Sequence, residues 1–396
     1  MTVESVIQLP LDDRFDRFRR IDWWDQDKLS NAKVLVIGAG ALGNEVLKNL
    51  ALLGVGNVFI ADSDRVETSN LSRSVLFRDS DVGRAKSEVA AASVRSIYPE
   101  IRATHFEGNV VFDLGLGVYR WADLVIAGLD NREARLHVNR CCYRVNRPWV
   151  DAATEALRGV VRVFMAPEGA CYECTMSAND WHALKERRGC AGLRAVSPDL
   201  GRVATTPITT SILAAIQVQE ALKILHGMAS LSGQGLVADG LLNEFYTVAF
   251  HRNDECNSHE SLERVIQLDV RTTDISPRSL LDETRKQLGA RSQLDLMHEL
   301  LIALECPVCK RTERILRPMA SISEERAFCG DCGSERRPIA TRSILGHEEF
   351  ADFTFAELGF PPFDIVSARH DFTSIGFEFS GDSATVLKSL QEGGRA

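Results

Sequence analysis

An apolar run that leads directly into a glycine-rich turn constrains this chain more than any other feature of its sequence. Residues 34–37, Val-Leu-Val-Ile, have the character of a strand that is buried on both faces. The turn GAGALG follows at once and places Gly38, Gly40 and Gly43 before a segment whose apolar residues recur at helical spacing. A second apolar run, NVFIADSD, comes next. This order predicts a βαβ unit.

The glycine-rich turn has a chemical meaning as well as a structural one. Backbone N–H groups at such a turn can approach phosphate oxygens at a helix N-terminus, where the helix dipole favours negative charge. Asp62 ends the second apolar run, about 20 positions further on, and fits a hydrogen bond to a ribose hydroxyl. An NAD-dependent enzyme satisfies this much of the pattern, so further residues must decide between cofactors.

Charged residues downstream favour a nucleoside triphosphate over a nicotinamide. Asp64 follows Asp62, SNLSRSVLF contains Asn70 and Arg73, VGRAKSEVA contains Lys86, and GLDNREARLHVNR contains Asp130. Attack on the α-phosphorus of a triphosphate needs cations around the phosphates and a carboxylate for Mg²⁺. Each of these residues taken singly fits a solvated surface charge. Their joint occurrence favours a triphosphate site.

The order of these motifs resembles the ThiF and MoeB family, whose other branch contains the ubiquitin-activating enzymes. The resemblance rests on RFDRFRRI, on the glycine-turn segment through SNLSR, on VGRAKSEVA, on GLDNREARLHVN and on CYEC, and it covers about residues 14–260. It implies a Rossmann-like α/β fold with a mostly parallel sheet and flanking helices. It also implies adenylation of the C-terminal glycine of a ubiquitin-fold protein, with release of pyrophosphate.

The same resemblance assigns roles to individual residues. The implied ATP site consists of Gly38, Gly40, Gly43, Asp62, Asp64, Asn70, Arg73 and Lys86. Asp130 matches the family's Mg²⁺ carboxylate. Arg17 matches an arginine that enters the active site from a second subunit, so a homodimer is implied. Arg17, Arg73, Lys86 and Asp130 are therefore the expected catalytic residues of adenylation.

Two groups of cysteines have the spacing of zinc sites. Cys306 and Cys309 pair with Cys329 and Cys332, and the 19 residues between the pairs fit a zinc ribbon. Four thiolates close a tetrahedral site without an open position, so its expected role is structural.

The second candidate zinc site is less regular. Cys171 and Cys174 in CYEC match the family's first metal-binding pair, which the family usually completes with another CxxC. This chain offers Cys256 and His259 in ECNSH instead. A Cys₃His set is acceptable to zinc because imidazole is a normal ligand. The alternative is a free Cys256 and an exposed His259.

The remaining cysteines divide into two kinds. Cys141 and Cys142 lie on an expected helix and are interpreted as small buried thiols. Cys190 follows KERRG, and its cationic neighbours favour the thiolate. Ubiquitin-activating relatives carry their thioester-forming cysteine in this interval, so Cys190 is the expected nucleophile. An incidental loop cysteine is the alternative.

The chain length of 396 residues predicts two or three domains. We expect a helical arm over 1–30, an adenylation domain with the catalytic-cysteine loop over 31–260, and a small α+β domain over 261–396 that contains the ribbon at about 300–340. Within the adenylation domain a long helix is expected from Thr209 to His226.

The C-terminal domain has its own pattern. Ser276 and Pro277 are expected to start a helix that stops near Gly289. SQLDLMHELLIALE reads as a strand, and the segment TFAELGFPPFDIVSARHDFTSIGFEF reads as strands at both ends around a PP turn. Docking of a conjugating enzyme and capping of the ribbon are equal alternatives for the role of this domain.

Charge and hydropathy argue against several classes of protein. The formal net charge is 46 − 55 = −9, which argues against a general nucleic-acid binder and against an RNA-modifying relative. No run reaches the ~20 apolar residues of a membrane span, and the N-terminus lacks the pattern of a secretory signal. We expect a cytoplasmic protein.

The resulting functional prediction is a two-step enzyme. It adenylates a ubiquitin-like protein, forms a thioester on Cys190 and transfers the product to a conjugating enzyme. The main alternative is an adenylyltransferase for a sulfur-carrier protein that needs no thioester. A scaffold without turnover is disfavoured because the phosphate-facing residues are retained.

Overall fold

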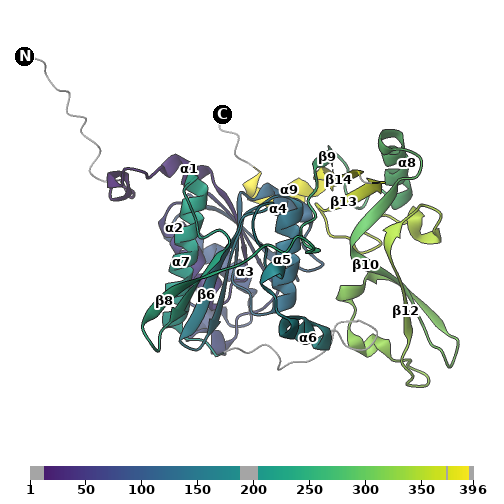
Figure 1. Ribbon diagram of the computed structural model, residues 1–396, viewed down its shortest axis with the longest axis horizontal. Helices are drawn as coiled ribbons and strands as arrows, with labels where there is room; N and C mark the ends of the chain where they lie inside the picture. The colour runs from purple at the N-terminus through teal and green to yellow at the C-terminus, as the bar shows by residue number, and fades with distance from the viewer. Residues whose placement is uncertain (1–12, 188–203, 372, 392–396) are drawn as a thin grey trace, which may run out of the picture.

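The computed structural model describes residues 13–187, 204–371 and 373–391, and its strands form two sheets (Figure 1). The first sheet contains β1 (Lys33–Ile37), β2 (Asn57–Asp62), β3 (Arg102–Glu107), β4 (Leu124–Ala127), β5 (Trp149–Glu155), β6 (Arg158–Phe164), β7 (Gln234–Asp239) and β8 (Glu244–Ala249). Its strand order is β3-β2-β1-β4-β5-β6-β7-β8. Neighbours from β3 to β5 are parallel and neighbours from β5 to β8 are antiparallel. The expected Rossmann-like α/β fold is confirmed.

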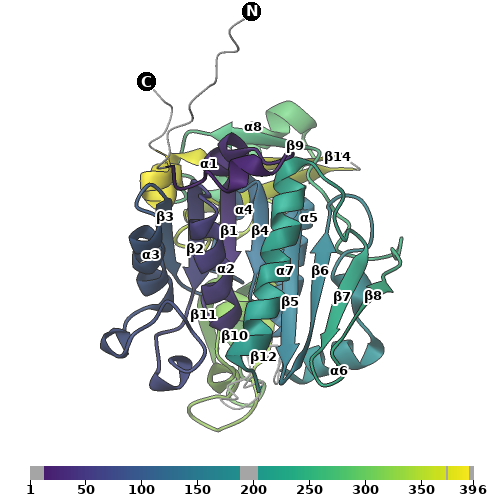
Figure 2. The ribbon, with the colours of Figure 1, turned by 90° about the vertical axis from the view of Figure 1, so that its left-hand side faces the viewer.

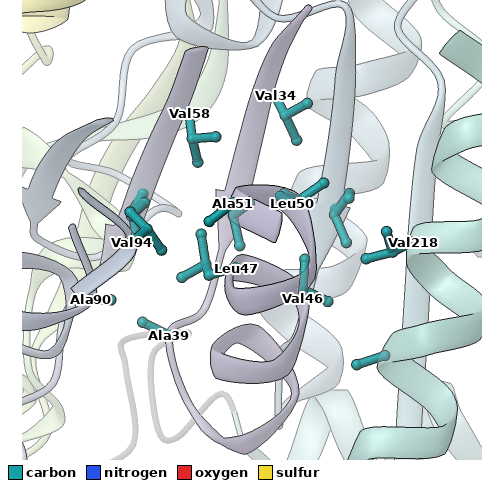
Figure 3. Close-up of a cluster of buried hydrophobic side chains, with 14 of the residues drawn as sticks. Val34, Ala39, Val46, Leu47, Leu50, Ala51, Val58, Ala90, Val94 and Val218 are labelled. Carbon is teal, nitrogen blue, oxygen red and sulfur yellow. The ribbon is translucent and has the colours of Figure 1, made fainter. Parts of the chain in front are cut away.

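Helices cover both faces of this sheet. They are α1 (Gln26–Asn31), α2 (Ala41–Leu52), α3 (Lys86–Ile97), α4 (Leu116–Trp121), α5 (Arg132–Arg144), α6 (Ala178–Arg187) and α7 (Pro207–His226). The helices α2, α3 and α7 pack on one face, and α4 and α5 pack on the other (Figure 2). Because side chains alternate along a strand, Val34 and Val36 enter the first core while Leu35 and Ile37 enter the second. Figure 3 shows Leu47 of α2 among the side chains of the first core.

Local sequence signals set the ends of the main helices. Thr206 caps α7 by accepting a hydrogen bond from the backbone of Thr209, Pro207 occupies the first turn, and Gly227 ends the helix at a φ of 72°. The long helix expected up to His226 is confirmed. By length and composition α7 could cross a membrane, but Gln217 is fully buried and its Nε2 donates to the Ala127 carbonyl of β4 at 2.9 Å. These contacts are those of a core helix.

The second sheet belongs to the C-terminal part of the chain. Its strands are β9 (Arg264–Leu268), β10 (Gln293–Glu305), β11 (Thr312–Pro318), β12 (Arg337–Ile344), β13 (Ile365–His370) and β14 (Thr373–Phe379), and its helices are α8 (Pro277–Leu288) and α9 (Ser383–Leu387). The order is β11-β10-β13-β14-β9, with β12 also paired to β10. Ser276 caps α8, as its sequence predicted.

The two sheets share a hydrophobic core. Leu262, Phe363 and Ile365 pack into the cluster formed by α4, α5 and the first sheet. The backbone N–H of Leu116 donates to Asp364 at 2.9 Å, across this boundary. The part of the chain that carries the second sheet is therefore fixed to the first sheet by buried contacts.

The helical arm expected over 1–30 consists of two short pieces where the structure describes it, from residue 13 onward. Its described residues form one 3₁₀ turn, Phe18–Arg20, and the six-residue helix α1, which starts anew because Asp25 caps it. Aromatic packing explains the break, since the rings of Phe18 and Trp24 lie 4.6 Å apart. A single amphipathic helix cannot bring these side chains together in this way.

The structure also corrects the expectation of a strand before the PP turn. Residues 354–360 form turns rather than a strand, and the hairpin lies after them, between β13 and β14. Phe355 and Leu358 are both fully buried, at the spacing of three that a turn allows. Asp371, with a φ of 52°, takes the hairpin turn.

Candidate functional site

The glycine turn connects β1 to α2 and has no room for side chains at two of its three glycines. Gly38 has a φ of 90°, and a Cβ there would lie 2.5 Å from the Gly128 carbonyl oxygen. A Cβ on Gly43 would lie 1.8 Å from the Gly38 carbonyl oxygen. A Cβ on Gly40 would meet nothing within 4 Å. Gly38 and Gly43 therefore serve packing, whereas Gly40 leaves open space at the N-terminus of α2, where a phosphate group fits.

Asp62 fixes this turn from the end of β2. Its Oδ2 accepts a hydrogen bond from the Ala39 backbone at 2.6 Å, and its Oδ1 accepts one from the Asp64 backbone at 2.7 Å. Burial raises the pKa of this carboxyl, and the nearby Lys86 opposes the effect. Asp62 joins the turn to the loop after β2, beside the expected ribose position.

Lys86 begins α3 and is held by the same loop. Its Nζ lies 2.8 Å from Asp64 Oδ2, and its side chain is 11% exposed while that of Asp64 is 61% exposed. Asn70 and Arg73 lie in the connection between β2 and α3. Asn70 accepts a hydrogen bond from the Glu67 backbone at 2.9 Å, and Arg73 donates to the Ser69 carbonyl at 2.7 Å.

Asp130 lies in the loop between β4 and α5. It is exposed, and its Oδ1 accepts a hydrogen bond from the Asn131 side chain at 3.1 Å. Because β2, β1 and β4 are parallel neighbours, the residues after their carboxyl ends share one edge of the sheet. After β1 the chain continues to β2 and β3 on one side of β1, and it then returns to β4 on the other side of β1. The edge where this change of direction occurs is a topological switch point.

The N-terminal arm that carries Arg17 packs away from this edge. Phe15 packs on Tyr98 with ring centroids 5.8 Å apart, and Arg14 donates to the carbonyl of Ile97, the last residue of α3. Phe15 also lies against Gly54, just after the C-terminus of α2, since a Cβ there would lie 2.3 Å from its ring. The glycine turn lies at the N-terminus of α2, a helix about 18 Å long at ~1.5 Å per residue. The arm of one chain therefore lies at the opposite end of the sheet from that chain's own glycine turn.

The four atoms of the Cys₃His candidate converge. Cys171 Sγ lies 3.7 Å from Cys174 Sγ and 3.6 Å from Cys256 Sγ, and Cys174 Sγ lies 3.3 Å from His259 Nε2. Burial and the nearby Arg252 lower the pKa of His259, which favours the neutral imidazole that binds metals. These four residues could hold a zinc ion.

The ribbon cysteines converge in the same way. Cys306 and Cys309 follow β10, and Cys329 and Cys332 precede β12. Their sulfur atoms all lie within 4.8 Å of one another, and the Cys309 backbone donates to Cys306 Sγ at 3.3 Å. A donor set of four thiols fits a structural zinc site.

The remaining cysteines follow their expected division as far as the structure describes them. Cys141 and Cys142 are buried on α5, and burial raises the pKa of both thiols. Inert packing thiols are therefore supported for this pair. Cys190, the predicted nucleophile, lies outside the described residues.

Sequence reasoning missed two buried polar residues beside the site. Asn44 of α2 is fully buried, donates to the Ala39 carbonyl at 2.6 Å and accepts from the Leu76 backbone at 2.8 Å. Asp151 of β5 is fully buried between Arg135 and Arg162. A charged residue inside the apolar run WVDAA was the available signal for Asp151.

A groove lies next to Asp151 on the antiparallel part of the sheet. Its volume is about 450 Å³, and it is lined by Ala153, Thr154, Glu155, Arg158, Gly159, Val160, Arg162, Val237, Val248 and Phe250. Apolar walls with a few charged groups are typical of a binding groove.

The doubly wound sheet and its glycine turn define a protein of the Rossmann-like α/β class. Residues 13–258 match the model of the ThiF family. The chain therefore belongs to the ThiF family.

Curated relatives come from two branches. The sulfur carrier protein ThiS adenylyltransferase of Escherichia coli is 30% identical over 232 residues, which span 58% of this chain and 87% of that protein. The SUMO-activating enzyme subunit uba-2 of Caenorhabditis elegans is 39% identical over 150 residues, which span 37% of this chain and 26% of that protein. The match to the second relative thus spans about a quarter of its length.

Solved structures agree with the fold. Escherichia coli MccB, in a complex with MccA-N7isoASN, is 24% identical, with a TM-score of 0.53 over 63% of this chain and 75% of that chain. This likeness concerns the fold alone.

Proposed function

We propose that this chain uses ATP to adenylate the C-terminal glycine of a ubiquitin-like protein. The observation that carries the proposal is the shared edge at the ends of β1, β2 and β4. The loops at this edge carry Gly40, Asp62 and Asp130, and Lys86 pairs with Asp64 in the loop after β2. This edge combines a phosphate position, a ribose acceptor, a cation and a free carboxylate, which are the parts that ATP requires. The names of two relatives support the proposal, since one is a SUMO-activating enzyme subunit and the other is an adenylyltransferase for the sulfur carrier protein ThiS.

The reaction follows from these positions. The phosphates of ATP lie at the open N-terminus of α2, beside Gly40, and the ribose lies against Asp62. A carboxylate oxygen of the terminal glycine attacks the α-phosphorus, and pyrophosphate leaves with the electron pair of the broken P–O bond. Lys86 and Arg73 stabilise the charge that develops on the phosphate oxygens. Asp130 would hold Mg²⁺, which would supply positive charge to the phosphates when bound.

Arg17 acts in the active site of a partner subunit in this proposal. The arm lies at the opposite end of the sheet from its own glycine turn, so Arg17 reaches a site only across a dimer. Two apolar side chains on α7 are open to such a partner, since Ile208 is 66% exposed and Ile212 is 43% exposed. Because these residues lie four apart on a helix, they share one face that a partner subunit can cover.

The groove beside Asp151 receives the extended tail of the ubiquitin-like protein. It follows β5 and β6 toward the carboxyl edge of the sheet, and Arg158 and Arg162 supply donors for backbone carbonyls along its length. A groove of about 450 Å³ accommodates a few residues of an extended peptide.

Thioester formation on Cys190 is the second proposed step. The thiolate attacks the carbonyl carbon of the acyl-adenylate, and AMP leaves. The acyl group then passes to a ubiquitin-conjugating-type enzyme. We place this chemistry in the cytoplasm, with a structural zinc ion in each cysteine cluster.

A sulfur-carrier adenylyltransferase is the second candidate. The observation in its favour is that the sequence match spans 87% of the length of the ThiS adenylyltransferase. Such an enzyme needs the adenylation edge but no thioester on Cys190.

The two candidates differ in one product. The chain is incubated with MgATP and a panel of mass-tagged ubiquitin-fold proteins that end in glycine. A DTT-sensitive adduct that forms on the wild type and on Cys142→Ala, and is lost in Cys190→Ala, supports the conjugation pathway. Adenylation without any such adduct contradicts it and favours the sulfur-carrier enzyme.

A further inference from the structure

Asp151 is a fully buried carboxylate next to the proposed magnesium site. It lies on β5 opposite Ala127, the last residue of β4, and the loop after β4 carries Asp130. Its Oδ1 accepts from Arg135 Nε at 2.9 Å, and its Oδ2 accepts from Arg162 Nε at 3.0 Å. Burial alone would raise the pKa of this carboxyl, but the two guanidinium groups outweigh burial and lower it. Asp151 is therefore held as a carboxylate.

Arg135 connects this carboxylate to the loop of Asp130. Its Nη2 donates to the carbonyl oxygens of Leu129 and Ala152, the second at 3.1 Å. Leu129 directly precedes Asp130, and Ala152 directly follows Asp151. One guanidinium group thus joins the Asp130 loop to the backbone of β5. A planar guanidinium suits this task because its donors have a fixed geometry.

The charges explain why a carboxylate is needed at position 151. Asp130 is among the negative charges that act on Arg135. If Asp151 did not engage the Arg135 side chain, this cation would be free to pair with Asp130 and would compete with Mg²⁺ for it. With Asp151 present, Arg135 is turned toward β5, and the Asp130 carboxylate stays exposed.

We propose that Arg135 and Asp151 are positioning residues that hold the Asp130 loop and keep its carboxylate free for Mg²⁺. This inference rests on the proposed function, which gives Asp130 its role. Neither residue touches ATP in this account. Their effect is indirect, like that of the hydrogen-bond partners that orient metal ligands in other proteins.

Magnesium dependence of ATP binding tests this role without a protein substrate. Calorimetry on the full chain measures the Mg²⁺ concentration that half-saturates ATP binding. Asp151→Asn should raise this concentration by about 10- to 100-fold, and Asp130→Asn should do the same. Asp239→Asn is the matched control, because Asp239 on β7 pairs with Arg158 and lies on another strand. It should leave the value unchanged.

A double variant distinguishes an effect of Asp151 that acts through Asp130 from an independent effect on the protein. If Asp151 acts only through Asp130, Asp130→Asn/Asp151→Asn should be no worse than Asp130→Asn alone, whereas independent effects would add. Arg135→Lys replaces Asp151→Asn in the same cycle if the latter does not fold.

The outcomes are distinguishable. A wild type that binds no ATP overturns the proposed function and this inference with it. A wild type that binds MgATP normally, beside a folded Asp151→Asn or Arg135→Lys with unchanged magnesium dependence, overturns the positioning role alone. Additive effects in the double variant overturn it as well.

Discussion

The Gly38 carbonyl oxygen would lie only 1.8 Å from a Cβ on Gly43, so these two residues pack backbone against backbone. Gly40, between them in sequence, has a φ of −71° and open space where a Cβ would point. The turn thus contains two glycines that the fold requires, Gly38 and Gly43, and one, Gly40, that packing alone does not require.

Alanine substitutions should separate these two requirements. Gly43→Ala should destabilise the protein by about 1–3 kcal/mol, because the backbone must move to admit the methyl group. Gly40→Ala should unfold at nearly the wild-type temperature but bind ATP about tenfold or more weakly, a loss of at least ~1.4 kcal/mol. Thermal unfolding and calorimetry with MgATP measure the two effects. Equal loss of stability in both variants would contradict the assignment of Gly40 to phosphate.

Mixing of two inactive variants tests action across a dimer. Arg17→Ala and Asp130→Asn each lack one part of every site, but a heterodimer of the two carries one intact site. Random mixing should therefore restore about a quarter of the wild-type pyrophosphate exchange. Subunit exchange is verified with differently tagged chains. Absence of any recovery after proven exchange would place Arg17 outside the active site.

Metal analysis tests the two cysteine clusters separately. We expect one zinc ion in each, and Cys171→Ser and Cys306→Ser should each remove one, because a site that lacks a ligand binds metal weakly. His259→Ala should behave like Cys171→Ser. Cys142→Ala, a cysteine outside both clusters, is the control. Full zinc content in His259→Ala would remove this residue from the ligand set.

Asp364 should make stability depend on pH. Burial raises the pKa of this carboxyl to about 6, above the ~3.9 of an unfolded chain. The protonated Asp364 therefore contributes to the free energy of unfolding at low pH, and this contribution is lost as the pH rises through about 6. The loss lowers the free energy of unfolding by up to about 3 kcal/mol. Asp364→Asn should gain up to that amount relative to the wild type between about pH 3 and pH 8, since the difference builds up as the pH passes from about 3.9 to about 6.

Urea unfolding at both pH values measures this gain. The exposed turn residue Asp371, changed to Asn, is the solvent-exposed control. An unchanged difference between Asp364→Asn and the wild type at the two pH values would contradict an ionised, buried Asp364.

Local signals made much of the architecture predictable. The strand before Gly38, the spacing of the ribbon cysteines and the caps of α7 and α8 each depend on residues close in sequence. The Cys₃His cluster was also predictable, because the CYEC motif supplies two of its four residues.

Long-range packing was not predictable in the same way. Asp151 meets Arg135 and Arg162 across three elements, and no periodicity marks that contact. The arm is broken into two short helical pieces because Phe18 and Trp24 pack together, a contact that the local sequence does not reveal. The strand expected before the PP turn was wrong, because Phe355 and Leu358 are both buried at a spacing of three residues, which would put them on opposite faces of a strand.

Pyrophosphate exchange into ATP tests the central claim most directly. The chain is assayed with ubiquitin-fold proteins that end in glycine and with the same proteins lacking that glycine, using wild type and Asp130→Asn. We predict exchange that needs the terminal glycine and that falls by about 10² or more in Asp130→Asn, because the amide removes the charge that holds Mg²⁺. Exchange at the wild-type rate in folded Asp130→Asn, at saturating Mg²⁺, would contradict the assignment of this edge as the adenylation site.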